Sequence, residues 1–383
     1  MKNFNRFSLW VILASATLTV MAGAIISPVL NLMRDGLGVD PASVGFIITT
    51  HALFLALFSP LIGNLVDRIG ARKPLMFGLL LYGVAGGSGL FITSYWVLIL
   101  SRAVLGIAVA AIFVSITVMI LNLYKGDERN KVMGWRGSAN SFGGIIWPLI
   151  GGVLGGYSWH LPFAVYLLGL PAGLLALIAV PEVHQEKTDD AGEKGSVLMV
   201  FRDNPILYAI YGLRFLTMLL LFNIVVFGLQ LLEKVGISNP SHIALFMSGM
   251  GISAGLTSLM YGKIKSRLSY KTIVLITLAL WTISFAMISQ ASSGWVMAAS
   301  ITLYGIGHGM ILPAVMVWAG EIGPVSFRGR IVSYLGISGH IGQFLSPVIF
   351  SPAFLFLGLN GVFLVAGGIC ALLFLLFLFG MRR

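Results

Sequence analysis

The sequence predicts an all-α integral membrane protein with 12 transmembrane helices, arranged as two pseudo-symmetric six-helix bundles. Three observations predict this fold: the composition, a count of long apolar stretches, and an internal repeat. Of the 383 residues, 58% are hydrophobic and 10% are charged, whereas a soluble domain typically carries about 25% charged residues. Because a water-soluble fold cannot hide this much apolar surface, we expect the chain to lie in a lipid bilayer.

The apolar stretches are long enough to cross a bilayer, which takes about 20 residues. Clusters of charged residues, proline and glycine separate them into twelve predicted spans. These spans cover residues 8–33, 42–65, 74–93, 95–123, 131–156, 160–180, 204–232, 240–262, 270–290, 294–318, 329–351 and 356–380. The first span is too long for a signal peptide and many similar segments follow it, so we interpret it as a retained helix.

The distribution of basic residues tests this count. If the N-terminus is cytoplasmic, 19 of the 24 Lys and Arg residues fall in cytoplasmic segments, and only Arg34 and Lys234 fall in outer loops. Cytoplasmic loops are enriched in Lys and Arg, so the split favours twelve spans in the cell membrane (plasma or inner) with both termini in the cytoplasm. The same loops account for the net charge of +11, and we therefore expect no nucleic-acid partner.

The longest polar stretch, residues 181–202, lies between the sixth and seventh spans. We interpret it as a cytoplasmic linker between an N-terminal six-helix bundle, residues 1–180, and a C-terminal six-helix bundle, residues 203–383. Its charges are those of a solvated loop.

The two predicted bundles align when the chain is shifted by 199 residues. The shift pairs Arg68 with Arg267, Gly106 with Gly305, and Pro148 with Pro347, among others. One offset serves three separate helical regions without a gap, which chance matches of glycine would not do. Parallel repeats of this kind form two similar bundles that rock about a central site.

The loop between the second and third spans carries a motif. It reads Gly63-Asn-Leu-Val-Asp67-Arg68-Ile-Gly70-Ala-Arg72-Lys73. This closely resembles the loop signature G-x-x-x-D-R-x-G-R-R/K of the major facilitator superfamily. The resemblance implies secondary, gradient-driven transport by alternating access, with Asp67 pairing with a loop arginine to lock the outward-open state. Gly63 would let a neighbouring helix approach closely. The alternative interpretation is a basic cytoplasmic loop with an incidental acid.

Two further motifs are similar to those of exporters in this family. The fourth span contains Arg102, at the position of an arginine linked to proton transfer in drug exporters, but Leu105 replaces the usual glutamine. The fifth span contains a sequence similar to the antiporter signature G-x-x-x-G-P-x-x-G-G: Gly143-Gly144-Ile-Ile-Trp147-Pro148-Leu-Ile-Gly151-Gly152. Trp147 stands where that signature has glycine, so ordinary glycine-rich helix packing is the alternative. The resemblance covers nearly the whole chain and implies the 12-helix branch that exports drugs and metabolites.

Charged groups inside the predicted spans are functional candidates, because a charge at membrane depth costs about 2.5–3.5 kcal/mol. All 13 acidic residues map to loops or helix ends, so the groups inside are basic. The candidates for substrate binding or a proton pathway are Arg102, Arg136, Arg214, His51, His308 and His340, with Asn140 and Gln343 as neutral partners. In the family, the spans that hold them line the central cavity. They favour a small-molecule substrate with an anionic group, which arginine can clamp with paired donors.

Each of these residues also has a structural interpretation. The histidines could bond to backbone carbonyls, Arg102 could brace neighbouring helices through carbonyls, and Arg136 could extend toward the cytoplasm. Two transport functions therefore remain open. One is proton-coupled efflux of small drug-like molecules or metabolites, and the other is uptake or exchange of a small organic anion.

The coupling ion is expected to be the proton, from the family resemblance. Without a central acid, its carrier would be a histidine or a peripheral acid such as Asp35, Asp67 or Glu321. A sensor or scaffold is less supported, and so is a membrane enzyme, because the sequence has no HExxH or GxSxG motif. It has no GxxxxGK[ST] loop either, which disfavours pumping by ATP. With the single cysteine, Cys370, we expect no metal site and no cofactor. We expect the protein to work as a monomer.

Overall fold

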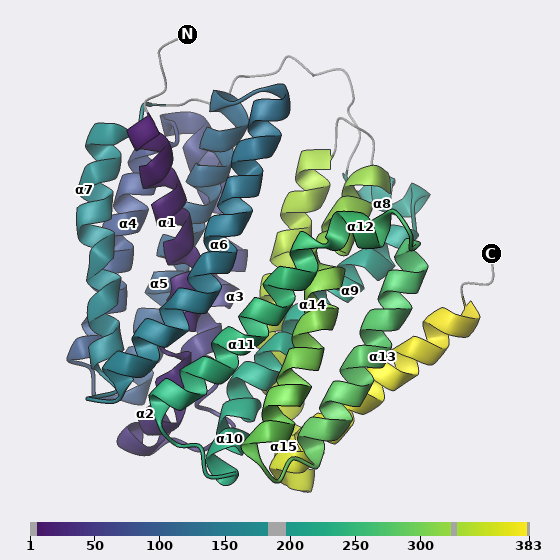
Figure 1. The fold of residues 1–383 in the computed structure, drawn as a ribbon. Helices are drawn as coiled ribbons and strands as arrows, with labels where there is room; N and C mark the ends of the chain where they lie inside the picture. The colour runs from purple at the N-terminus through teal and green to yellow at the C-terminus, as the bar shows by residue number, and fades with distance from the viewer. Residues whose placement is uncertain (1–5, 183–196, 323–327, 381–383) are drawn as a thin grey trace. The chain divides into compact units, whose positions relative to one another are not determined.

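The computed structural model describes residues 6–182, 197–322 and 328–380, and within these ranges the chain forms helices and turns without a strand (Figure 1). The all-α prediction is confirmed. The chain divides into two compact units. One comprises Met1–Asp40 with Phe46–Ala191, and the other comprises Pro41–Gly45 with Gly192–Arg383. Most of the predicted linker 181–202 lies outside the described residues, with its Lys187 and Lys194.

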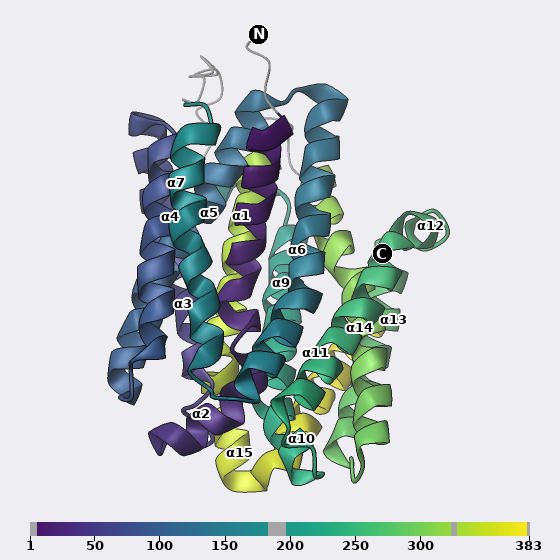
Figure 2. The ribbon, with the colours of Figure 1, turned by 60° about the vertical axis from the view of Figure 1, so that its left-hand side comes forward.

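The first unit is built from long apolar helices interrupted at glycine and proline. Its elements are α1 (Arg6–Ala24), η1 (Ser27–Val29), α2 (Leu30–Leu37), α3 (Phe46–Ile69), α4 (Arg72–Gly87), η2 (Ser88–Leu90), α5 (Tyr95–Leu123), α6 (Gly126–Gly155), η3 (Leu161–Leu168) and α7 (Gly169–Ala179). Tyr82, Phe163 and Tyr166 are among its largest fully buried side chains. Figures 1 and 2 show α4 beside α7 in both views.

The second unit has the same kind of construction. Its elements are α8 (Val197–Asp203), α9 (Ile206–Asn223), a π-helical turn η4 (Ile224–Gly228), α10 (Leu229–Lys234), α11 (Pro240–Leu259), α12 (Tyr261–Lys265), α13 (Tyr270–Ser289), α14 (Gly294–Ile322) and α15 (Arg328–Gly380). Gly358 divides α15 into two helices, because its backbone is not helical. Its φ of 69° is left-handed, a conformation that residues with a side chain rarely adopt. Trp281, Tyr304 and Phe285 lie fully buried in this unit.

The count of twelve crossings fits these elements. Nine helices in the described ranges are long and apolar enough to span a membrane, and the last of them, Tyr334–Phe379, is 46 residues long. The break at Gly358 makes two crossings of that helix. The remaining two crossings are α4, which is short at 16 residues but continues into η2, and α6, which begins with a charged segment.

Glycines on the same offset hold equivalent helices together in the two units. A Cβ atom on Gly106 of α5 would collide with the backbone carbonyl of His51 on α3. In the second unit, a Cβ atom on Gly305 of α14 would lie 2.7 Å from the carbonyl of Met250 on α11. The contacted residues, His51 and Met250, are separated by 199 residues, as the two glycines are. Small residues allow this close packing in membranes, and here the sequence repeat is also a repeat of helix contacts.

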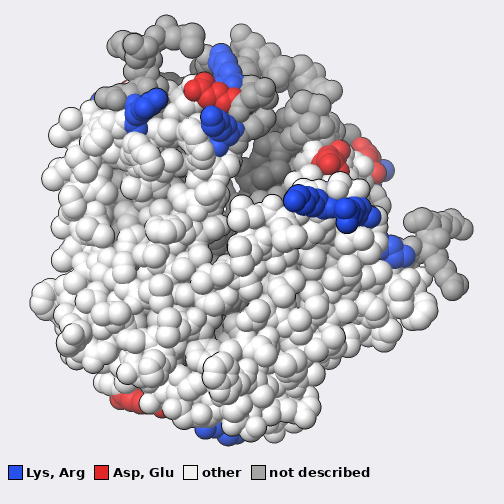
Figure 3. All heavy atoms as spheres, viewed as in Figure 1, with Lys and Arg blue, Asp and Glu red and all other residues white. Residues whose placement is uncertain are grey.

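Charged side chains gather at the ends of the helices in each unit, and the face seen in Figure 3 shows an uncharged band between the ends. In the second unit, α8 and α12 lie at one end and α10 at the other (Figure 1). The first end carries Arg202, Lys263 and Lys265, whereas the opposite end carries Lys234. The end with α8 and α12 therefore carries residues predicted to be cytoplasmic, and the end with α10 carries the residue predicted to lie in an outer loop.

Candidate functional site

The loop motif forms a tight turn between α3 and α4. Gly70 has a φ of 83°, which favours glycine, and Asp67, Arg68 and Lys73 are exposed. Within the described structure, a Cβ on Gly63 would meet no atom outside its own stretch of helix within 4 Å.

The ion pair described at this loop joins Arg72 to Glu182, with a distance of 3.4 Å from Nε to Oε2. The backbone N–H of Arg72 also donates to Oε1 of Glu182 at 3.2 Å. Because Arg72 begins α4 and Glu182 follows α7, a carboxylate lies at the positive end of a helix. The sequence assigned Glu182 to a solvated linker, and its role in tying α4 to the end of α7 was missed.

Arg102 on α5 is fully buried, and the end of α4 holds its guanidinium. The Nη2 atom donates to two carbonyls in the last turn of α4, both at 3.3 Å, and to Ser101 Oγ at 3.1 Å. Its Cζ lies 5.1 Å from the ring centres of both Phe163 and Tyr166. The Nε and Nη1 atoms of Arg102 have no acceptor in the described structure. The Nη2 bonds join α5 to the end of α4, and aromatic faces attract cations. These contacts favour a brace between helices over a place in a substrate site.

Arg136 on α6 has comparable contacts with α5. Its Nη1 donates to Thr117 Oγ1 at 2.8 Å, and its Cζ lies 4.7 Å from the ring centre of Phe113. One turn further along α6, the buried Oδ1 atom of Asn140 has no hydrogen-bond donor in the described structure. His51 is packed differently, since a Cβ on Gly23 of α1 would lie 3.1 Å from its Cε1. These three residues lie in the first unit but in separate contacts.

The antiporter-like motif packs α6 against α1. A Cβ on Gly151 would collide with the backbone of Ile25, and the indole of Trp147 donates to the carbonyl of Thr17 at 3.1 Å. Gly143 lies under the same indole, because a Cβ there would be 3.1 Å from its Nε1. Pro148 lies inside the helix and Gly152 is buried. Trp147, the departure from the family signature, thus makes a hydrogen bond of its own to α1.

In the second unit, α9 and α15 run in parallel with a fixed register. The hydroxyls of Ser338 and Ser346 donate to the carbonyls of Tyr211 and Leu219, both at 2.8 Å. Between these bonds, Gly339 faces Arg214: a Cβ there would lie 2.8 Å from Nε and 3.0 Å from Cζ of the guanidinium. The absence of a side chain at residue 339 leaves room for Arg214 against α15.

Arg214 is buried, with 8% of its surface exposed. Its Nε and Nη1 atoms have no hydrogen-bond acceptor in the described parts of the chain. The third helix of this region, α14, is joined to α9 by a hydrogen bond from Tyr304 Oη to the carbonyl of Thr217, at 3.4 Å. His308, one turn along α14, stacks against Tyr304 with ring centres 6.0 Å apart.

The structure brings four of the predicted residues together here. Arg214 interacts electrostatically with both His308 and His340, and His340 Nδ1 lies 3.4 Å from Gln343 Oε1. Sequence reasoning had selected each residue from its depth in a span, but their convergence follows from the register of three helices. Gly339 was missed, because it is one of 47 glycines and its own spacing carries no signal.

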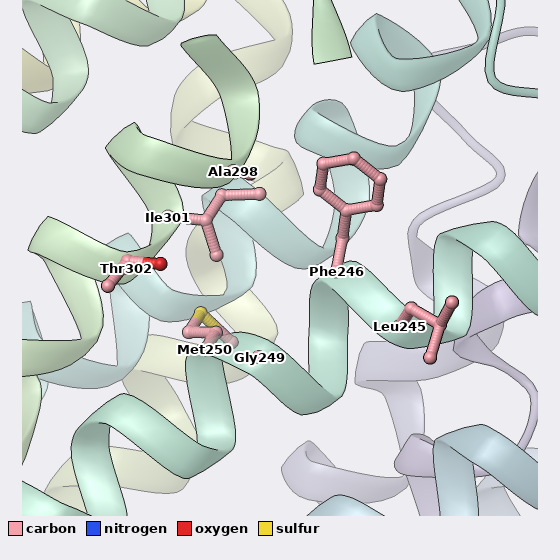
Figure 4. Close-up of a pocket in the computed structure, with 7 residues that line it drawn as sticks. All are labelled: Leu245, Phe246, Gly249, Met250, Ala298, Ile301 and Thr302. Atoms are coloured by element: carbon pink, nitrogen blue, oxygen red, sulfur yellow. The ribbon is translucent and has the colours of Figure 1, made fainter. Parts of the chain in front are cut away.

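A separate open pocket lies between α11 and α14 (Figure 4). It is lined by Leu245, Phe246, Gly249, Met250, Ala298, Ile301 and Thr302. Its lining is apolar apart from the hydroxyl of Thr302, and it contains none of the predicted charged residues. In the described ranges, no group of three or more His, Cys, Asp and Glu side chains is placed to hold a metal ion.

The comparisons with known proteins agree in family. The family model described as "Major Facilitator Superfamily" matches residues 12–239 and 229–383. The chain is 27% identical to the bacillibactin exporter of Bacillus subtilis (strain 168), over 94% of this chain and 92% of that protein. It is also 27% identical to the class B tetracycline resistance protein of Escherichia coli, over 87% and 86%.

A solved structure of a D-xylose-proton symporter has the same fold. It superposes with a TM-score of 0.82 at 16% identity, covering 98% of this chain and 97% of that one. The resemblance noted in the loop motif therefore extends through both units. The chain belongs to the major facilitator superfamily and is a multi-pass membrane transporter of small molecules, not an enzyme.

Proposed function

We propose that this transporter is a secondary active exporter that moves small organic molecules out of the cell by alternating access. The observation that carries the proposal is the pair of exporter and resistance relatives, which match at 27% identity over more than 85% of both chains. The contact between α6 and α1 at Trp147 and Gly151 supports it, because this is where the antiporter-like motif lies.

In this proposal, the moving parts are the bundles 1–180 and 203–383, joined by the cytoplasmic linker 181–202, with both termini in the cytoplasm. The basic residues at one end of each unit support this orientation. The protein acts as a monomer. Protons drive efflux, and a histidine carries them in place of the acid that the spans lack.

A second candidate is uptake or exchange of a small organic anion. The observation that favours it is the group of basic side chains around Arg214, which has no carboxylate partner among the described residues. An anion could be moved in either direction through such a group, so the substrate's charge and the direction of transport are separate questions.

Transport in oriented membrane vesicles tests both candidates. Efflux predicts that everted vesicles accumulate tetracycline when their interior is acidic, and that collapsing the pH gradient with nigericin abolishes accumulation. Uptake predicts instead that right-side-out vesicles accumulate benzoate. Export in everted vesicles that is indifferent to the pH gradient would remove proton coupling, and accumulation only in right-side-out vesicles would remove efflux.

A further inference from the structure

Arg214 is the buried cation of the second unit that its own surroundings explain least. A guanidinium has five N–H donors, yet the Nε and Nη1 atoms of Arg214 have no hydrogen-bond acceptor in the described ranges. The cations found over aromatic rings in those ranges include Arg102 and Arg136 but not Arg214. A buried donor without a partner is destabilising by about 1–3 kcal/mol, and by more when it is charged. Such a group in a native structure calls for a ligand or another functional explanation.

The neighbours of Arg214 do not supply that partner. His340 directly follows Gly339, whose backbone lies against the guanidinium. His308 stacks against Tyr304, which bonds to α9, and both histidines are within electrostatic range of Arg214. His308 is itself nine-tenths buried, and its Nδ1 atom has no hydrogen-bond partner in the described structure. All three side chains can donate N–H groups, Arg214 is positively charged, and no carboxylate forms an ion pair with it among the described residues.

We propose that Arg214, His308 and His340 form a carboxylate-binding site within the C-terminal half, which holds the anionic group of the transported molecule. A guanidinium binds two carboxylate oxygens through parallel N–H groups, and these charge-assisted bonds are about twice as strong as neutral ones. The imidazoles of the two histidines add N–H donors beside the guanidinium. A cation is repelled here, and a neutral amide gains only the weaker bonds.

Gly339 sets the position of the Arg214 guanidinium. Its backbone lies against the guanidinium, with the Cβ position 2.8 Å from Nε and 3.1 Å from Nη2. A methyl group at residue 339 would push the guanidinium away from α15 and from His340, which follows it in the chain. Gly336 is on the same helix one turn earlier, and a Cβ there meets no atom within 4 Å. The two glycines therefore provide a matched pair of variants.

The site's role in transport rests on the proposed function, but its binding of a carboxylate does not. The test uses the full-length purified protein with three ligands of one shape and different charge: benzoate, benzamide and benzamidine. Ligand that binds only the folded protein raises the unfolding temperature in proportion to its affinity. We expect benzoate to raise the unfolding temperature most, benzamide to raise it much less, and benzamidine to leave it unchanged.

The variants locate the effect. Arg214→Gln and Gly339→Ala are expected to weaken benzoate binding about tenfold or more, measured by calorimetry, whereas Gly336→Ala keeps the wild-type affinity. Arg214→Lys keeps the charge but loses the fork, so it should retain part of the affinity. The proposal is overturned if benzoate does not bind wild-type protein, if benzamidine binds as well, or if Arg214→Gln binds benzoate normally.

These outcomes are independent of the direction of transport. If benzoate binds through Arg214 but everted vesicles export nothing, the efflux proposal fails and the site stands. If vesicles export tetracycline while benzoate binding is indifferent to Arg214, the site fails and efflux stands.

Discussion

A buried guanidinium lies in each half of the transporter, and the two differ in what surrounds them. Arg102 in the first unit bonds to carbonyls at the end of α4 and lies between two aromatic rings. Arg214 in the second unit lies against the backbone of Gly339. The Nε and Nη1 atoms of both arginines have no acceptor in the described structure, so the two differ in the Nη2 hydrogen bonds and the ring contacts that Arg102 makes. Burial alone thus does not identify a binding residue. The identity of the partners distinguishes a structural cation from one available to a substrate.

The internal repeat sharpens this comparison. The 199-residue shift places Ile301, which lines the apolar pocket, at the position of Arg102, and it places Ser15 at the position of Arg214. The glycines at 106 and 305 keep both their identity and their helix contacts. The two halves therefore share residues that hold helices together and differ at the buried arginines Arg102 and Arg214.

The shared packing predicts the largest effect. Gly106→Ala and Gly305→Ala should each lower the free energy of unfolding by about 3 kcal/mol, because the added methyl group meets the backbone of a neighbouring helix that no rotamer change can move. Denaturant unfolding of the purified variants measures this. Gly144→Ala and Gly255→Ala are the controls, since a Cβ atom at either meets no atom within 4 Å. Equal stability of the two sets would show that the repeat is not a packing repeat.

Arg102→Leu should have the next largest effect, a loss of about 2 kcal/mol of unfolding free energy, since hydrogen bonds to a charged group contribute about 1.5–3 kcal/mol. The change removes the Nη2 hydrogen bonds to the carbonyls of the last turn of α4 and removes the cation from beside the rings of Phe163 and Tyr166. Thermal unfolding is the measurement. An Arg102→Leu protein as stable as wild type would remove the distinction between the two arginines.

Arg214→Leu should act in the opposite direction. Without ligand, the variant should be more stable than wild type by about 1 kcal/mol, because it removes a buried charge whose Nε and Nη1 atoms have no acceptor in the described structure. Thermal unfolding of Arg214→Leu and Arg102→Leu under the same conditions shows whether the two changes in stability have opposite signs. A variant that is destabilised as strongly as Arg102→Leu would mean that Arg214 also serves mainly as a brace.

Much of the fold could be predicted from the sequence, because spans, breaks and repeats are local or periodic. Gly358 is an instructive case, since the predicted gap between the last two spans, residues 352–355, is helical and the break lies three residues later. The candidate site could be predicted only as a set of residues at membrane depth. Which of them meet depends on the register of α9, α14 and α15, and that register is fixed by serine-to-carbonyl bonds and glycines that look alike in sequence.

The loop motif gives the smallest predicted effect. The pair of Arg72 and Glu182 is partly exposed, with side-chain exposures of 32% and 25%, and such pairs contribute about 0–1 kcal/mol. Glu182→Gln should therefore lower the unfolding free energy by less than about 1 kcal/mol at low salt. Salt at about 1 M screens charges within about 3 Å and should erase this difference.

Asp67→Asn is the matched control, because Asp67 is exposed in the same motif and forms no ion pair within the described structure. If Asp67→Asn destabilises the protein as much as Glu182→Gln, the loop's stability comes from its general charge. If only Glu182→Gln responds to salt, the contact between α4 and the end of α7 is a specific one, and any transport defect of Asp67→Asn must arise elsewhere than in folding.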